Sequence, residues 1–107
     1  MTATSPPLRL AMLGMIEGNG HPYSWSALIN GYEPEGLAQC PYAMIRGYIG
    51  RHPPETVGIP GAKVTHVWTD NPSDAPCVAA VGCIPNIVDK PEDVIGQVDA
   101  VIIATDD

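Results

Sequence analysis

The glycines at positions 14, 18 and 20 could form a phosphate-binding loop, because they lie between an apolar segment and a segment with helical spacing. Glycine lets backbone N–H groups approach a pyrophosphate closely, and the positive end of a helix dipole favours the anion. The spacing GxxxGxG differs from the GxGxxG of dinucleotide sites, and an ordinary tight turn accounts for the same residues. Gly14, Gly18, Asn19 and Gly20 are therefore predicted either to contact a cofactor phosphate or to form such a turn.

Asp70 is the candidate ligand for a ribose, since it closes a segment rich in β-branched residues. In dinucleotide sites an acid at this place accepts hydrogen bonds from the adenine-ribose hydroxyls and repels a 2′-phosphate. The usual separation from the glycine loop is about 20 residues, and a Gly/Pro-rich stretch at 31–61 makes it much longer here. The alternative is a polar turn that leads into a capped helix. As a ribose ligand, Asp70 would select NAD over NADP.

The histidines and cysteines indicate neither a catalytic centre nor a metal site. His21 follows the glycine loop, where it either approaches a phosphate or packs at a helix entry, and one histidine without a partner does not define acid–base chemistry. Cys40, Cys77 and Cys83 lack the spacing of metal ligands. We therefore predict no catalytic residue and no metal ligand. The odd number of cysteines and the lack of a signal peptide indicate a reduced, cytoplasmic protein.

Length and charge exclude several classes of protein. The 107 residues suffice for one domain, and the net charge of −7 disfavours nucleic acid and anionic membranes as partners. Hydrophobic residues make up 45% of the chain, which excludes a disordered acidic tail. No apolar run approaches the ~20 residues of a membrane span.

Apolar segments and turn signals alternate along the chain and predict alternating strands and helices. Predicted strands cover 8–14, 63–69, 84–88 and 99–105, and predicted helices cover 24–30, 74–81 and 92–97. Ser24 and Ser73 are candidate caps of the first two helices, and Pro85 favours an edge position for the third strand. Strands that are apolar on both faces, with helices between them, indicate a parallel sheet. The carboxyl ends of all its strands then share one edge, where ligands bind.

This order predicts an α/β, Rossmann-like domain over residues 8–107, with a parallel sheet and flanking helices. The domain would hold about four strands of a fold that commonly has six, and it would therefore be incomplete. Residues 1–7 are predicted to be an unstructured lead-in. The glycines and prolines of residues 31–61 predict a long surface insertion with a short helical turn at 42–49.

The carboxyl-terminal part of the chain resembles a known family. The sequence VDAVIIAT at 98–105, preceded by DKPEDVIGQ, is similar to the fourth strand and preceding helix of the glucose–fructose oxidoreductase and inositol dehydrogenase (Gfo/Idh/MocA) family. LRLAMLG at 8–14 with its glycine loop, and THVWTDNP at 65–72, resemble the first and second strands of that family. The resemblance covers residues 8–107 and is weakest over 31–61.

The resemblance implies an NAD(P)-dependent oxidoreductase that transfers a hydride to or from a sugar, a polyol or a related small molecule. Gly14, Gly18 and Gly20 would lie beside the pyrophosphate, Asp70 beside the ribose, and Thr105 on the loop that flanks the cofactor. Asp106 replaces a proline that is frequent in the family. The lysine of the Glu-Lys-Pro segment and the substrate-binding sheet domain would follow residue 107, so a substrate would bind only with that domain present.

Two other classes of function remain open. The chain could be a non-catalytic module that binds a nucleotide, or that binds another subunit, including a second copy of itself, through its last strand. It could also be a flavodoxin-like binding domain with the same sheet but without the dinucleotide.

Overall fold

The chain forms an α/β domain built on an all-parallel sheet, as predicted. The computed structural model describes residues 6–105, so most of the predicted lead-in, as well as Asp106 and Asp107, lie outside the described residues. The strands are β1 (Leu8–Leu13), β2 (Ala62–Trp68), β3 (Asn86–Ile87) and β4 (Ala100–Ile103). They are arranged in the order β3-β2-β1-β4, and every neighbouring pair is parallel. This order matches the first four strands of the Rossmann order 3-2-1-4-5-6.

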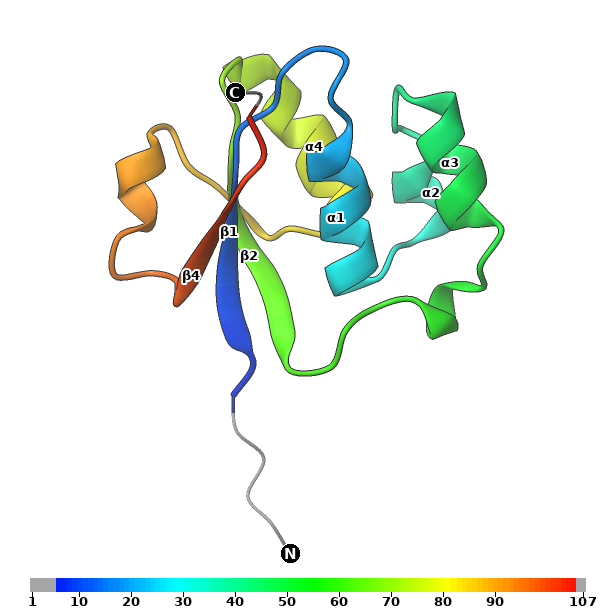
Figure 1. Cartoon of the computed structure of the whole chain (residues 1–107), viewed down its shortest axis with the longest axis horizontal. Coiled ribbons are helices and arrows are strands. Elements are labelled where there is room, and N and C mark those ends of the chain that lie inside the picture. The colour runs from blue at the N-terminus through cyan, green and yellow to red at the C-terminus, as the bar shows by residue number, and fades with distance from the viewer. Residues whose placement is uncertain (1–5, 106–107) are drawn as a thin grey trace, which may run out of the picture.

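Helices cover the two faces of the sheet unequally. The α-helices are α1 (His21–Asn30), α2 (Pro34–Leu37), α3 (Ala43–Gly50) and α4 (Ala75–Gly82). Short 3₁₀ helices are η1 (Pro54–Thr56), η2 (Pro72–Asp74) and η3 (Pro91–Val94). Figure 1 shows α1 and α4 on one side of the sheet, α2 and α3 beyond α1, and η3 on the opposite side.

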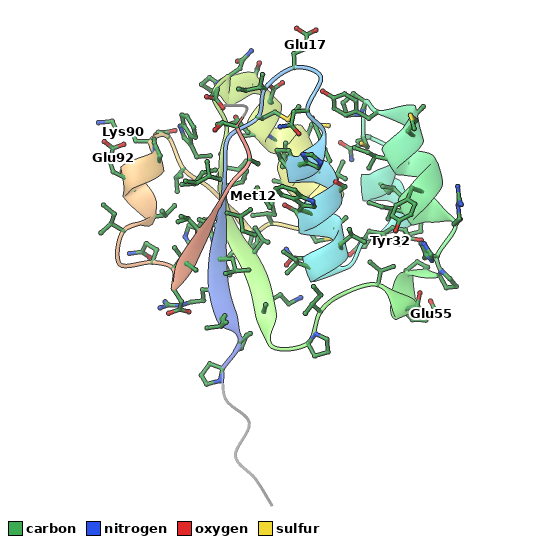
Figure 2. All side chains as sticks on the ribbon, in the orientation of Figure 1. Met12, Glu17, Tyr32, Glu55, Lys90 and Glu92 are labelled. Atoms are coloured by element: carbon green, nitrogen blue, oxygen red, sulfur yellow. The ribbon has the colours of Figure 1, made fainter. Side chains whose placement is uncertain are left out.

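The core lies mainly between the sheet and the layer of α1 and α4. Met12 of β1, Val67 of β2 and Val78 of α4 are fully buried there, and Figure 2 shows Met12 beside the helix layer. Ala11, which alternates with Met12 along β1, is equally inaccessible. The middle of β1 is therefore buried on both of its faces, as its continuous apolar sequence predicts, whereas Leu8 at its start is exposed.

The first helix begins earlier than predicted. Its first residue is His21, Gly20 stands at the N-cap, and Ser24 lies inside the helix without capping it. Pro22 fits the first turn because the N–H groups of that turn have no partner within the helix. The glycine loop therefore leads directly into α1, as an anion site at a helix N-terminus requires.

The helix after β2 is capped by a different residue than predicted. Asn71 Oδ1 accepts a hydrogen bond from the Ser73 N–H (3.1 Å) and another from the Ser73 hydroxyl (2.8 Å). Asn71 thus caps η2, and α4 begins only at Ala75. The predicted cap at Ser73 is wrong because the Ser73 hydroxyl donates to Asn71 Oδ1, and the residue at the N-cap of α4 is Asp74, whose side chain makes no cap bond.

The predicted helix over 92–97 is only the 3₁₀ helix η3, which ends where Gly96 adopts a φ of +80°. The insertion at 31–61 holds more regular structure than predicted, namely α2, α3 and η1. The short helix expected at 42–49 corresponds to α3.

The strand expected at 84–88 is reduced to β3. It lies at the edge of the sheet, as the presence of Pro85 predicts. No helix within residues 6–105 has the length and apolar character needed to span a membrane.

Candidate functional site

The candidate site lies at the carboxyl edge of the sheet, where the strand order reverses between β1 and β4. The chain leaves β1 through Gly14, whose N–H donates to the Trp68 carbonyl at the end of β2 (2.8 Å). Gly14 has a φ of +108°, and a Cβ atom there would overlap the side chain of Thr105. Only glycine fits at this point. Open α/β sheets bind their ligands at such a switch point.

Asp70 meets the glycine loop directly. Its Oδ1 accepts a hydrogen bond from the Met15 N–H at 2.8 Å, although 55 residues separate the two along the chain. Because the insertion packs beyond α1, β2 still pairs directly with β1 (Figure 1). Asp70 is exposed, and its second carboxylate oxygen bonds to no group within residues 6–105. One oxygen therefore fixes the loop, and the other can face a ligand.

Asn19 joins the glycine loop to the end of β4. Its Nδ2 donates to the Ala104 carbonyl at 3.2 Å, and its Oδ1 accepts from the His21 N–H at 3.2 Å. Asn19 thus spans the switch point and at the same time holds the first turn of α1. These bonds show that Asn19 holds the glycine loop in position. From the sequence, Asn19 was predicted either to contact a cofactor phosphate or to form part of a tight turn.

Several N–H groups of the loop remain available for a ligand. Among residues 6–105, the N–H groups of Ile16, Glu17 and Gly20 donate to no other group. Gly18, by contrast, donates its N–H to the Tyr42 hydroxyl at 3.0 Å. Unpaired N–H groups in an exposed loop before a helix form an anion-binding concavity.

Two hollows flank the loop. One, of about 590 Å³, lies on the side of β2 and is lined by Met15, Gly18, Tyr42, Asn71 and Asp74, among others. The other, of about 620 Å³, lies between α1 and α3 and has mostly apolar walls. Glu17 lines both and projects from the crest of the loop (Figure 2).

The charges around these hollows are negative. Glu17 and Asp74 contribute carboxylates, and no Lys or Arg belongs to the lining of either hollow. A bound phosphate would therefore depend on backbone N–H groups and on the dipole of α1 for its stabilisation.

The buried groups behind the loop stay uncharged. Burial, together with a hydrogen bond to the Cys77 thiol, raises the pKa of Tyr23. Burial also raises the pKa of the Cys40 thiol. Thiolate is the nucleophilic form of cysteine, so Cys40 is not an activated nucleophile.

His21 packs on Trp25 at the entry of α1, as one of its two predicted roles requires, and it also lines the hollow between α1 and α3. Its ring stacks on Trp25 with 4.3 Å between ring centroids and 14° between planes.

Tyr42 comes from the insertion. From the sequence, Tyr42, Met44 and Tyr48 could cover a cofactor, close an oligomer interface, or form a small cluster that holds the insertion down. The sequence did not predict the contact of Tyr42 with Gly18 in the glycine loop.

Within residues 6–105, no three or more His, Cys, Asp or Glu side chains converge into a group that could hold a metal ion. Comparison with protein-family models, with curated proteins and with solved structures found no match for this chain.

Proposed function

We propose that the chain binds NAD at the carboxyl edge of its sheet, as the nucleotide-binding portion of a Gfo/Idh/MocA-type oxidoreductase for a sugar, a polyol or a related compound. One observation carries the proposal: the Asp70 carboxylate lies 2.8 Å from the Met15 N–H, beside the switch point. This contact joins the acid to the glycine loop, which supports the arrangement that a dinucleotide spans.

The residues present fit a dinucleotide. The free N–H groups of Ile16, Glu17 and Gly20, at the N-terminal end of α1, would hold the pyrophosphate, with Gly14 allowing close approach. The second oxygen of Asp70 would accept hydrogen bonds from the ribose hydroxyls. Thr105, which packs against Gly14, would flank the cofactor on the side of β4. Hydride chemistry belongs to the nicotinamide, and these residues would bind and orient it.

The electrostatics of the β2 side favour NAD over NADP. Glu17 and Asp74 line the hollow on the β2 side, Asp70 contacts Met15 at its border, and no cationic side chain belongs to that hollow. A 2′-phosphate would add negative charge among these carboxylates.

Titration with NADH tests the proposal, with energy transfer from Trp25 and Trp68 to the bound cofactor as the signal. We expect saturable energy transfer in the wild type. The dissociation constant for NADH should be about tenfold higher in Asp70→Ala, because a charge-assisted hydrogen bond to the ribose is lost.

Glu17→Gln should bind NADH more tightly, because a carboxylate next to the phosphates is removed. Glu55→Gln, which makes the same charge change in η1 at the opposite end of the molecule (Figure 2), is the matched control. Wild-type protein without saturable transfer would contradict the proposal.

A second candidate function, a subunit-binding module, is favoured by the exposed edge of β4. Among residues 6–105 this strand pairs with β1 alone, and its residues Val101 and Ile103 are 45% and 67% exposed. Open apolar edges pair with other chains. Light scattering across a concentration series should then show that the wild type is a dimer and that Ile103→Lys is a monomer. Under this second function, neither the wild type nor Ile103→Lys should bind NADH.

A further inference from the structure

We propose that Tyr42, supplied by the insertion, completes the anion-binding loop and donates its hydroxyl proton to a phosphate oxygen of the bound dinucleotide. This inference rests on the proposed function, and it adds a ligand-binding residue from outside the strands and helices of the basic fold.

The hydrogen bonds of Tyr42 leave its proton available. Its hydroxyl oxygen accepts the Gly18 N–H at 3.0 Å, and its O–H donates to no group within residues 6–105. A phenol has one donor proton and can accept as well. A phosphate oxygen at the loop would therefore complete a chain from the Gly18 N–H through the Tyr42 hydroxyl to the anion. Each bond in such a chain polarises the next and strengthens it.

Packing fixes the direction of this hydroxyl. The Tyr42 ring meets the Tyr23 ring edge-on, with 5.8 Å between centroids and 63° between planes. On its other side a Cβ atom at Gly20 would lie 3.2 Å from Tyr42 Cδ2. The carbonyl of Tyr42 accepts the N–H groups of Ile45 and Arg46 at 3.1 Å, which anchors the residue at the start of α3. A donor held in this way costs little entropy when a ligand binds.

The hollow beside the loop offers no cationic side chain to a phosphate, so a neutral hydrogen-bond donor would contribute to phosphate binding. The hollow beside the loop contains Glu17, Asp74 and the Tyr42 ring but no Lys or Arg. A phenolic hydroxyl can bond to a phosphate there without a positive charge. Because this hollow lies on the β2 side with Asn71 and Asp74, the phosphate concerned is the one next to the adenosine.

Calorimetric titration of the full chain with adenosine, ADP, NADH and inorganic pyrophosphate tests this assignment. Tyr42→Phe removes the hydroxyl and keeps the ring. We expect its dissociation constants for ADP, NADH and pyrophosphate to rise about tenfold, the usual effect of one hydrogen bond to a charged group. Its dissociation constant for adenosine should stay within about twofold of wild type. Tyr48→Phe, also on α3, is the matched control, because its ring faces His52 and its hydroxyl makes no bond to the loop.

The outcomes separate the two proposals. Unchanged ADP affinity in Tyr42→Phe overturns the role of Tyr42, and so does an equal loss of adenosine affinity, which would mean that Tyr42 only shapes the hollow. A wild type that binds pyrophosphate, more weakly as Tyr42→Phe, but not NADH or ADP overturns the proposed function and leaves the anion site in place. A wild type that binds none of the phosphates overturns both. Thermal unfolding by circular dichroism verifies that both variants are folded.

Discussion

Asn30, the last residue of α1, holds three elements together through one side chain. Its Nδ2 donates to the Val64 carbonyl in β2 and to the Gly82 carbonyl at the end of α4, both at 2.9 Å. Its Oδ1 accepts the Val64 N–H at 2.7 Å. Asn30→Ala leaves all of these groups unpaired, and we expect the free energy of unfolding to fall by about 2–4 kcal/mol. Urea denaturation followed by circular dichroism measures this loss.

Asn86 provides the control, because its side chain makes a single bond, to the Thr65 carbonyl (2.9 Å), from an exposed position. Asn86→Ala should cost about 1 kcal/mol or less. Equal losses in the two variants would show that the bridge at Asn30 adds nothing to the stability of the junction.

Asp99 links the starts of β1 and β4 and makes stability depend on pH. Its Oδ2 accepts the Arg9 N–H at 2.8 Å, and its Oδ1 lies 3.3 Å from the Arg9 guanidinium. Hydrogen bonds from Arg9 lower the pKa of Asp99 below its ordinary value. The carboxylate therefore stabilises the folded state above the pKa that it has in the unfolded chain. This stabilisation is lost as the pH falls through the lower, folded-state pKa.

We accordingly expect the urea midpoint of the wild type to exceed that of Asp99→Asn at about pH 6, and the difference to shrink as the pH falls below the ordinary Asp pKa of about 3.9. The measurement is a set of urea titrations across this range. Asp89→Asn, at an exposed turn, should follow the wild type throughout. A difference between the wild type and Asp99→Asn that grew on acidification would mean that the Asp99 carboxylate destabilises the folded state.

At the scale of elements, the insertion is held to the core by the contact of α2 with α4. A Cβ atom at Gly36 would overlap the Ala80 carbonyl oxygen, which belongs to the backbone of α4 and cannot turn aside. Gly36→Ala should therefore cost about 1–3 kcal/mol, as overpacking usually does. Gly47 lies in α3 with no atom within 4 Å of its would-be Cβ. Gly47→Ala should stabilise by about 0.5–1 kcal/mol, the ordinary gain in a helix.

Thermal unfolding separates the two substitutions, because we expect the melting temperature to fall for Gly36→Ala and to rise for Gly47→Ala. A rise for both would mean that α2 does not approach α4 as closely as the structure shows.

The meeting of Asp70 with the glycine loop could be predicted from the sequence, because it follows from general rules. Parallel strands place their carboxyl ends on one edge, so residues just after β1 and β2 approach one another whatever the length of chain between them. The apolar runs of β1 and β4 and the turn after β2 sufficed to locate those ends. The hydrogen bond from the Met15 N–H to the Asp70 carboxylate confirms that the acid meets the glycine loop.

The arrangement of the insertion could not be predicted in the same way. Its glycines and prolines indicate loops, yet Pro34 and Pro54 occupy first turns of short helices, where the missing N–H costs nothing. The contact of Tyr42 with Gly18 depends on how α3 packs against α1, and periodicity does not encode that placement. The early start of α1 at His21 was missed for a related reason, since Pro22 fits a first turn as well as it ends a helix.

At the scale of the whole molecule, the sheet is covered by whole helices on one side and by little on the other. Figure 1 shows α1 and α4 on one side of the sheet and the 3₁₀ helix η3 on the other side. In η3 the buried side chain is Val94, only 4% exposed, and the neighbouring Ile95 is 79% exposed. The thin side of the molecule thus depends on a short segment with one buried apolar residue.

Because so little covers this side of the sheet, we expect Val94 to contribute strongly to the free energy of unfolding. Val94→Ala removes two methyl groups from a buried position with few neighbours to fill the space, and we expect a loss of about 1–3 kcal/mol in the free energy of unfolding. Ile95→Ala, which removes more atoms from an exposed position, should change it by less than about 0.5 kcal/mol. Urea denaturation gives both values, and hydrogen exchange of the β4 amides should accelerate only in Val94→Ala. A larger loss for Ile95→Ala would mean that another surface covers this face of the sheet in solution.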